Sequence, residues 1–457
     1  GVIPPDLKDV TSTGCARAAQ AIELGERAAR ATADRLRALS VSPGEWTAFL
    51  ARQRRRPAPP PVLDRVELRH DSALADAYLR SRLHAAPDEP LDAERLRQDL
   101  EHLFGLGEFE RVTFEVLPTT PGRAELRVLA RQRSWGPNYV NFGVQVADDF
   151  EGGAGYQFGV QYTMRQLNAY GGEWRTRVQI GTERRFSSEL YQPVEPTGTL
   201  FVAPRVLARR FPLRAYQGDE LVAEVEARGA GVGFDVGAQL GRFGELRCGF
   251  ERVWAEGQVE LTSVGLEGER IDDARAFVSL RVDDVDDPVF AREGQLFRAD
   301  WAWGFDDFGA DAHYQFARVA AGKAFGNDDV GGILFVRYET ALEGAFPLTD
   351  VPSLGGLFQL SGVPVGARLG DHLAFAILAG YWQLNDPEAG PFSAPAYLGV
   401  TLEAGDVTAR RSQVFADPTL AASVSFGLDT LLGPILLGYG FAEGGRDSVY
   451  LSVGFTF

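Results

Sequence analysis

The sequence lacks a long hydrophobic run. None of its 457 residues belongs to a stretch that approaches the ~20 consecutive apolar residues of a membrane-spanning helix. The most apolar segment, Leu431 to Tyr439, is short and contains Gly433 and Pro434. If this chain crosses a membrane, it must do so as a closed β-barrel, because only helices and barrels satisfy all their backbone hydrogen bonds in lipid.

Positive charge and cysteine are also scarce. The 46 Lys and Arg residues against 63 Asp and Glu residues give a formal net charge of −17. This excludes nucleic acid as a general partner, because phosphate binding requires a basic surface. Cys15 and Cys248 are too few and too far apart for a disulfide framework. Cys248 shares a strand face with Leu246 and Phe250, which favours a role as a small hydrophobic side chain.

Motifs for catalysis and metal binding are missing as well. The chain has no Gly-x-Ser-x-Gly nucleophile elbow, and its five histidines have no metal-ligand spacing. The acidic segment from Asp283 to Pro288 lacks the glycine and the spaced glutamate of a calcium loop, so we expect a solvated turn. The sequence therefore predicts no metal site, no cofactor and no catalytic residue in this chain.

Glycine and phenylalanine are abundant, with 52 and 30 residues. From residue 134 to residue 457, apolar and polar residues alternate with period two, which is the pattern of strands. The segment 140–146 is one example, and the last nine residues are another. There Leu451, Val453, Phe455 and Phe457 share one face, while small or polar residues occupy the other. The small residues Gly229 to Gly233 indicate a strand in which bulky side chains are unwelcome.

Strand length and strand number favour a membrane barrel over a soluble sandwich. We count about sixteen strands, mostly near ten residues long, and a tilted strand of that length matches the apolar band of an outer-membrane barrel. Short turns are expected at 167–172, 242–245 and 429–433. Long loops are expected at 184–198, 255–273 and 344–370, and a short connection near Arg228 breaks the alternation. The predicted fold is mainly β: a sixteen-stranded antiparallel transmembrane β-barrel over residues 134–457.

Three further parts precede the barrel. Residues 1–56 have a helical pattern, with a second helix starting at Pro43 and capped by Ser42. Residues 57–61 are a proline-rich linker. Residues 62–133 read as strand, helix, helix, strand, strand, with a helix cap expected at Asp71-Ser72 and a second helix that begins at Leu91-Asp92.

The order of elements in 62–133, together with Gly107, Phe109 and Val112 in a Gly-x-Phe-x-x-Val run, resembles a POTRA domain. POTRA domains are periplasmic modules that precede outer-membrane barrels. The resemblance implies binding of an extended polypeptide at a sheet edge, through main-chain hydrogen bonds that need no special side chains. A plain spacer is the alternative.

The barrel resembles the BamA-like superfamily of outer-membrane insertases and two-partner secretion transporters. One basis is the segment Leu360, Ser361, Gly362 and Val363 in the longest loop, and the other is the stretch from Gly433 to Phe441 before the last strand. The resemblance implies that the loop folds into the lumen. In the family its tip carries an Arg that pairs with an acidic group on the inner wall, followed by Gly and an aromatic residue. This chain has Ser361 and Val363 at the two flanking positions.

Residues 6–10 and the alanine-rich helix after them resemble the end of a patatin-like phospholipase domain. A known subgroup joins such a lipase to one POTRA domain and a sixteen-stranded barrel. The resemblance implies that the catalytic residues lie upstream of Gly1, and that barrel and POTRA export or tether the lipase.

The alternatives are an assembly factor of the BamA or TamA type and a two-partner secretion pore. The expected location is the bacterial outer membrane, with the POTRA domain in the periplasm. The expected partners are outer-membrane lipid, the barrel assembly machinery and a passenger or upstream lipase domain, and the sequence leaves open whether the chain forms a homo-oligomer.

Overall fold

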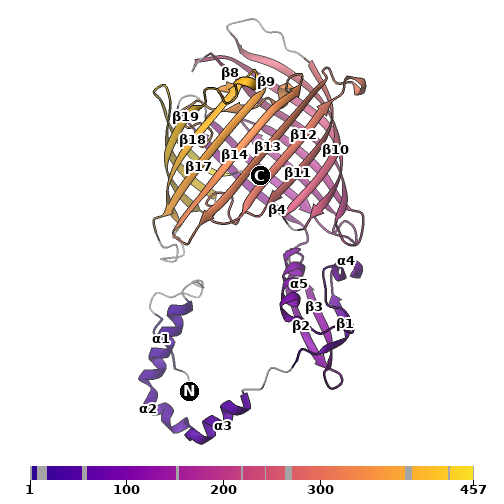
Figure 1. Cartoon of the computed structure of the whole chain (residues 1–457), viewed down its shortest axis with the longest axis vertical. Coiled ribbons are helices and arrows are strands. Elements are labelled where there is room, and N and C mark those ends of the chain that lie inside the picture. The colour runs from indigo at the N-terminus through magenta and orange to yellow at the C-terminus, as the bar shows by residue number, and fades with distance from the viewer. Residues whose placement is uncertain are drawn as a thin grey trace.

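A computed structural model describes residues 3–7, 18–53, 59–150, 154–217, 220–241, 243–262, 270–385, 394–430 and 433–455. A group of helices, a small α+β domain and a large barrel follow one another along the chain (Figure 1). In these residues, no helix is long and apolar enough to cross a membrane. Cys15 and Phe457, which the sequence analysis singled out, lie outside the described residues.

The N-terminal helices leave much of their apolar surface uncovered. They are α1 (Ala18–Ala31), α2 (Ala33–Leu36), the 3-10 turn η2 (Arg37–Leu39) and α3 (Pro43–Gln53). The predicted cap of α3 is confirmed, because the Ser42 hydroxyl accepts from the Glu45 N–H and the Glu45 carboxylate accepts from the Ser42 N–H. Trp46 and Phe49 stack on each other while both remain exposed. Helices of this size need a covering partner to be stable.

The α+β domain consists of β1 (Val62–His70), α4 (Asp76–Arg80), α5 (Ala93–Gly105), β2 (Phe109–Pro118) and β3 (Arg123–Gln132). Its sheet has the order β1-β3-β2, with β1 parallel and β2 antiparallel to β3, so β2 is an edge strand. The predicted start of the second helix at Leu91-Asp92 is confirmed, and the Asp92 carboxylate caps α5. The cap predicted at Asp71-Ser72 is wrong: α4 starts later without a side-chain cap, and Asp71 accepts from the Gln132 N–H instead.

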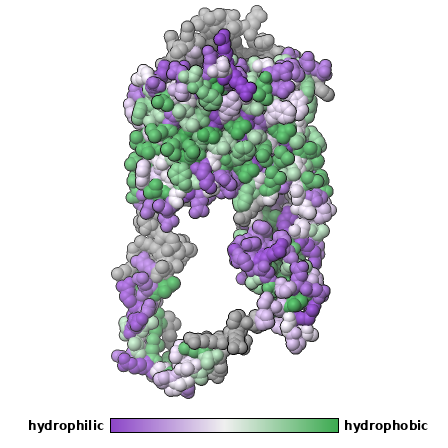
Figure 2. Space-filling view, in the orientation of Figure 1, coloured by the Kyte–Doolittle hydropathy of each residue, from purple (hydrophilic) through white to green (hydrophobic). Residues whose placement is uncertain are grey.

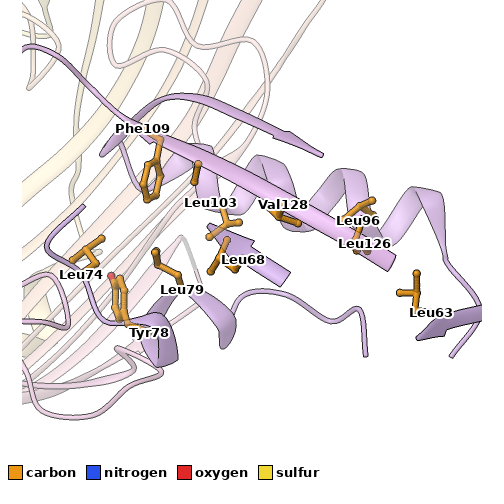
Figure 3. Close-up of a cluster of buried hydrophobic side chains, with 11 residues drawn as sticks. Leu63, Leu68, Leu74, Tyr78, Leu79, Leu96, Leu103, Phe109, Leu126 and Val128 are labelled. Atoms are coloured by element: carbon orange, nitrogen blue, oxygen red, sulfur yellow. The ribbon is translucent and has the colours of Figure 1, made fainter. Parts of the chain in front are cut away.

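Apolar side chains from both helices and all three strands form the core of this domain, as Figure 3 shows for Leu79, Leu103 and Leu126. On the opposite face of the sheet, charged side chains pair across strands. Hydrogen bonds from Arg69 and then Arg127 lower the pKa of the Glu67 carboxyl to about 2. The domain thus has one apolar and one charged face, as expected for a sheet covered by helices on one side only.

The barrel is closed and contains sixteen antiparallel strands, which confirms the predicted fold class and strand number. The strands are β4 (Tyr139–Asp148), β5 (Gly155–Met164), β6 (Glu173–Gly181), β7 (Arg184–Pro193), β8 (Leu200–Gln217), β9 (Glu220–Leu240), β10 (Gly244–Thr262), β11 (Arg270–Asp283), β12 (Gln295–Gly304), β13 (Tyr314–Gly326), β14 (Val330–Glu343), β17 (His372–Gln383), β18 (Ala396–Thr408), β19 (Thr419–Thr430), β20 (Gly433–Ala442) and β21 (Arg446–Phe455). In the closed ring β21 pairs with β4.

The apolar faces of the strands point outward. Phe142 on β4, Tyr156 on β5 and Leu402 on β18 are each about two-thirds exposed, whereas the polar residues between such positions face the lumen. Figure 2 shows the result on the visible face of the barrel as a hydrophobic band with hydrophilic rims above and below it. A wall of this kind is stable in contact with lipid.

Three predictions about the connections are wrong. The long loop expected at 255–273 is largely strand, because β10 continues to Thr262 and β11 begins at Arg270. Residues 184–198 are not a long loop, because β7 occupies Arg184–Pro193. There is no connection near Arg228, because β9 runs through it as one of three strands, β8 to β10, that are far longer than ten residues. Their ladders continue beyond the apolar band, and a periodicity read in the sequence cannot show where a bilayer ends. The prediction of a loop at 344–370 is confirmed.

Candidate functional site

The connection between β14 and β17 folds back into the barrel lumen. It contains the 3-10 turn η4 (Leu348–Asp350) and a short hairpin of β15 (Ser353–Leu354) and β16 (Arg368–Leu369). We call residues 344–371 the lumen loop. Its tip is the segment 360–363, where the Leu360 and Val363 side chains are fully buried among residues of β17, β19 and β20.

The tip is held by the Glu403 carboxylate, which projects into the lumen from β18. One carboxylate oxygen accepts from the Leu360 and Ser361 N–H groups at 2.7 and 2.8 Å, and the other accepts from the Ser361 hydroxyl at 2.7 Å. The Thr401 hydroxyl donates to the second oxygen at 2.6 Å. A buried carboxylate needs such partners. The Ser361 side chain and the tip backbone therefore supply the hydrogen-bond donors that the Glu403 carboxylate needs.

Glycines on the neighbouring strands make room for the loop. A Cβ atom on Gly440 of β20 would lie 2.5 Å from the Ser361 Cβ, and one on Gly438 would lie 2.9 Å from the Leu357 side chain. Both glycines belong to the stretch that the sequence analysis singled out before the last strand. Gly362 itself has φ +95° and lies against the β20 backbone, so that a side chain there would be strained and crowded.

The tip also contacts the strand that closes the barrel. The Gly362 N–H donates to the Tyr450 hydroxyl of β21 at 2.9 Å. Among the described residues, β21 pairs with β4 from Leu451 to Phe455, whereas the neighbouring β20–β21 ladder extends up to Arg446. Of the predicted assembly-signal residues, Leu451 and Val453 lie on the half-buried outer face of β21. The seam between β21 and β4 is therefore a short ladder with a loop contact beside it.

The base of the lumen loop is tied to the opposite side of the barrel. The Asp350 carboxylate lies 2.7 Å from Arg275 of β11, 3.3 Å from Arg318 of β13 and 3.7 Å from Arg209 of β8. Arg209 also donates to the Thr349 carbonyl at 2.9 Å. The loop thus bridges the lumen, with Asp350 anchored among arginines at one side and its tip anchored on Glu403 at the other.

The remaining lumen is polar. A cavity of about 570 Å³ lies along the inner side of β6 to β13. We call these strands the charged wall. The cavity is lined by the basic residues Arg175, Arg177, Arg185, Arg205, Arg247, Arg275, Arg281, Arg298 and Arg318 and by the acidic residues Glu189, Asp235, Glu251, Asp300 and Asp350. Many of them pair, as Arg205 does with Glu251 at 2.8 Å. Arginines exceed carboxylates, so this space favours water and anionic or polar segments over apolar ones.

The connection between β11 and β12, residues 284–294, crosses the lumen at the end where the α+β domain lies. Phe290 stacks on Tyr397 of β18 with ring centroids 3.8 Å apart, and its edge meets Tyr381 of β17. The acidic residues bind their own turn: Asp286 accepts from the Arg292 and Glu293 N–H groups. Burial raises the pKa of Asp286, but these hydrogen bonds outweigh it and the pKa is lowered. Within the described residues no acidic, histidine or cysteine group is arranged to hold a metal ion.

The α+β domain docks onto the same end of the barrel through its Gly-x-Phe-x-x-Val segment. Gly107 has φ +74° and packs against the Arg165 guanidinium, and Glu108 pairs with Arg165 at 3.0 Å. Phe109 is fully buried in the domain core, and Val112 packs against that core. This segment therefore joins the two bodies: its glycine and acid face the β5–β6 turn of the barrel, while its apolar residues hold the domain together.

An apolar groove runs beside the edge strand β2. It has a volume of about 490 Å³ between α5 and β2, and its main apolar walls are Leu96, Leu100, Phe104, Val112 and Phe114. Phe104 and Phe114 are each about half exposed. An open strand edge beside an apolar groove can accept an extended peptide, with main-chain hydrogen bonds to the strand and side chains in the groove.

The barrel and the joined domain are similar to solved structures of outer-membrane proteins. The chain superimposes on BamA of Haemophilus ducreyi lacking POTRA domains 1–3 with a TM-score of 0.64 at 12% identity, covering 86% of this chain and 85% of that chain. The fold is that of the BamA and CdiB barrels. CdiB of Escherichia coli (TM-score 0.58, 12% identity, 86% and 76% coverage) and CdiB of Acinetobacter baumannii (0.56, 10%, 87% and 74%) match similarly. No family model and no curated protein sequence matches this chain.

Sequence reasoning missed the partners of the lumen loop. Glu403, Tyr450 and Asp350 were not predicted as site residues. For Glu403 a signal was present, because it is a carboxylate between Thr401 and Gly405 on the small, polar face of a strand, which in a barrel is the lumen face. Nothing in the local sequence marks Asp350, since its three arginines come from three separate strands.

Proposed function

We propose that this chain is an outer-membrane barrel that transports or anchors a polypeptide, with the α+β domain acting as a single periplasmic POTRA domain. The observation that carries this proposal is the position of the open edge of β2 and its groove, on a domain fixed by Arg165 and Glu108 at one barrel mouth. A polypeptide captured there is next to the lumen. The lumen loop must then move aside before a polypeptide can pass through the lumen.

A finer proposal concerns the passenger. We infer that it is the chain's own N-terminal extension, a patatin-like lipase domain that ends in α1 to α3. The exposed Trp46 and Phe49 support this, because helices with such uncovered apolar side chains need another body to pack on. The lipase chemistry would belong entirely to that upstream domain.

The second candidate is a BamA-type assembly factor, and the short seam between β21 and β4 favours it. A short ladder is the weakest place in a closed barrel, so it is where an incoming strand could add to an edge. Transport through the lumen and assembly at the seam require different parts to move, and this difference can be tested.

Two disulfide locks separate the candidates, in a background where Cys15 and Cys248 are replaced by Ser. The first lock joins Leu357→Cys to Gly438→Cys, which truncates the leucine side chain that lies against that glycine. The second joins Ser452→Cys to Ala147→Cys, which are register partners across the seam. A reporter domain fused ahead of Gly1 is tested for digestion by protease added outside the cells.

Under the transport proposal, the oxidised loop lock abolishes digestion of the reporter and the seam lock leaves it unchanged, with recovery after reduction. Loss of other barrels from the outer membrane with the seam lock alone would support the assembly factor. Surface digestion that neither lock affects would contradict transport through this lumen.

A further inference from the structure

The outer surface of the barrel has a depression beside the ends of β6 and β7 that lie away from the α+β domain, and it extends across the middle of β8 to β10. It has a volume of about 680 Å³. The register places the outward-facing residues of its lining in two cross-strand rows. The first row is apolar and runs from Val178 through Phe186, Ala208 and Ala230 to Trp254. The bulky ends and the small middle of this row create the hollow.

The second row lies two residues further along each strand. Arg184 of β7 is paired with Arg210 of β8, Arg210 with Arg228 of β9, and Arg228 with Glu256 of β10. Three arginines therefore stand directly side by side. Like charges at directly opposite positions destabilise a sheet, so such a row is costly without an anion nearby.

Acidic side chains satisfy this row only in part. Arg210 forms an ion pair with Glu226, and Arg228 pairs with Glu256 at 2.9 Å. Arg184 is exposed, and no acidic residue forms an ion pair with it in the part of the chain that the structure describes. Three guanidinium groups against two carboxylates leave a positive site at the rim of an apolar hollow.

The two rows lie at the bilayer depths that the acyl chains and the headgroup of a lipid molecule occupy. Val178, Phe186 and Trp254 are each about two-fifths exposed on the face that carries the hydrophobic band. A tryptophan at the edge of such a band marks the headgroup level. The arginine row lies roughly 5 Å further from the bilayer centre along the barrel axis, given ~3.3 Å per residue and a tilt of ~45°. Arg252, which lies one row below Trp254, is paired with Asp272.

We propose that this depression binds an anionic glycolipid of the outer leaflet, with its phosphate groups on Arg184, Arg210 and Arg228 and an acyl chain along the apolar row. Guanidinium groups bind phosphate with paired, charge-assisted hydrogen bonds. The proposal rests on the outer-membrane location given under the proposed function, because that location assigns this end of the barrel to the leaflet that contains phosphorylated glycolipid. It is independent of whether the barrel transports a polypeptide.

Native mass spectrometry of the full chain, purified from phosphatidylcholine vesicles doped with bis-phosphorylated lipid A, tests the site. We expect retained lipid A on the unmodified protein and at least about a tenfold loss in Arg184→Gln, since a charge-assisted hydrogen bond disappears. Ala208→Phe, which fills the hollow without changing charge, should have a similar effect. The matched control is Arg411→Gln, the same change on an exposed residue of the β18–β19 loop.

Two further arms on the unmodified protein, a dephosphorylated lipid and a phosphate competitor, make the test decisive. Dephosphorylated lipid A should be retained at least about tenfold less, and excess inorganic phosphate should not displace lipid A, because it lacks the acyl chain. Equal retention of the dephosphorylated lipid, displacement by inorganic phosphate, or equal retention by Arg184→Gln and Arg411→Gln would each overturn the proposal. A heat-dependent shift in electrophoretic mobility shows that each variant is a folded barrel, and the reporter assay above reports separately on transport.

Discussion

The two sides of the lumen differ in what lines and fills the enclosed polar space. The side formed by β17 to β21, the loop wall, presents small residues such as Gly438 and Gly440, and the lumen loop covers it. The charged wall of β6 to β13 presents long arginine and carboxylate side chains that border an open cavity. Backbone can approach a wall only where side chains are small. The contrast indicates that the lumen loop fills the space beside the loop wall, whereas the space beside the charged wall remains open to solvent.

The charged wall contacts the lumen loop at Asp350. A substitution of this residue should have the largest effect on the difference between the two walls. Asp350→Asn leaves Arg275, Arg318 and Arg209 without a shared carboxylate, which costs about 3–5 kcal/mol when a buried pair is broken. We expect the loop base to detach and the lumen to become more selective for anions. Reversal potentials in planar bilayers measure the selectivity.

Asp328→Asn, in the exposed turn after β13, is the control with the same charge change. If Asp350→Asn gives the reversal potential of this control, Asp350 does not set the charge of the lumen.

On the loop wall, the largest effect should come from Glu403→Ala. Two buried N–H groups of the tip lose their acceptor, at about 1–3 kcal/mol each. The amides of the lumen loop should then exchange hydrogen far faster, which mass spectrometry of the 355–366 peptides detects. Asp417→Ala, in the exposed β18–β19 loop, should leave the exchange unchanged. Slow exchange in Glu403→Ala would mean that packing alone holds the tip.

Gly440→Val tests the small residues of the loop wall. The added side chain meets the Ser361 Cβ, and overpacking of this kind costs about 1–3 kcal/mol. We expect partial release of the tip, visible as protease cleavage within the loop. Gly380→Val is the matched control, because a Cβ at Gly380 meets nothing within 4 Å. Equal resistance of both variants would show that the loop tolerates bulk on this wall.

The smallest effect is expected at the turn that crosses the lumen below the loop. Phe290→Leu keeps an apolar side chain but loses the aromatic stack on Tyr397, which is worth about 1 kcal/mol. A modest rise in the frequency of brief channel openings should follow in single-channel recordings. Val289→Leu, a neighbouring exposed position, should record like the unmodified protein. A fully open channel in Phe290→Leu would make this turn, rather than the loop, the main plug.

Much of the fold could be predicted from the sequence because its signals are local. The alternation of apolar and polar residues identified the strands and their outward faces. The number and length of the strands indicated a closed barrel, which the structure has. The helix starts at Ser42 and at Leu91-Asp92 were recognisable because the signals at a helix N-terminus act within three residues. The wrong loop at 184–198 arose where arginine and serine interrupt the apolar pattern of β7, although the register there still pairs every residue.

The sequence by itself determined that the chain is a barrel with small and polar residues inside, since period-two alternation sets the face of each side chain. Only the tertiary structure decided which side chains meet. Glu403 and Ser361 are 42 positions apart, and Arg184, Arg210 and Arg228 form a row only because the register of three strands aligns them. A shift of one residue in any ladder would turn these side chains to the other face, so closure of the barrel, rather than the local sequence, brings both sites together.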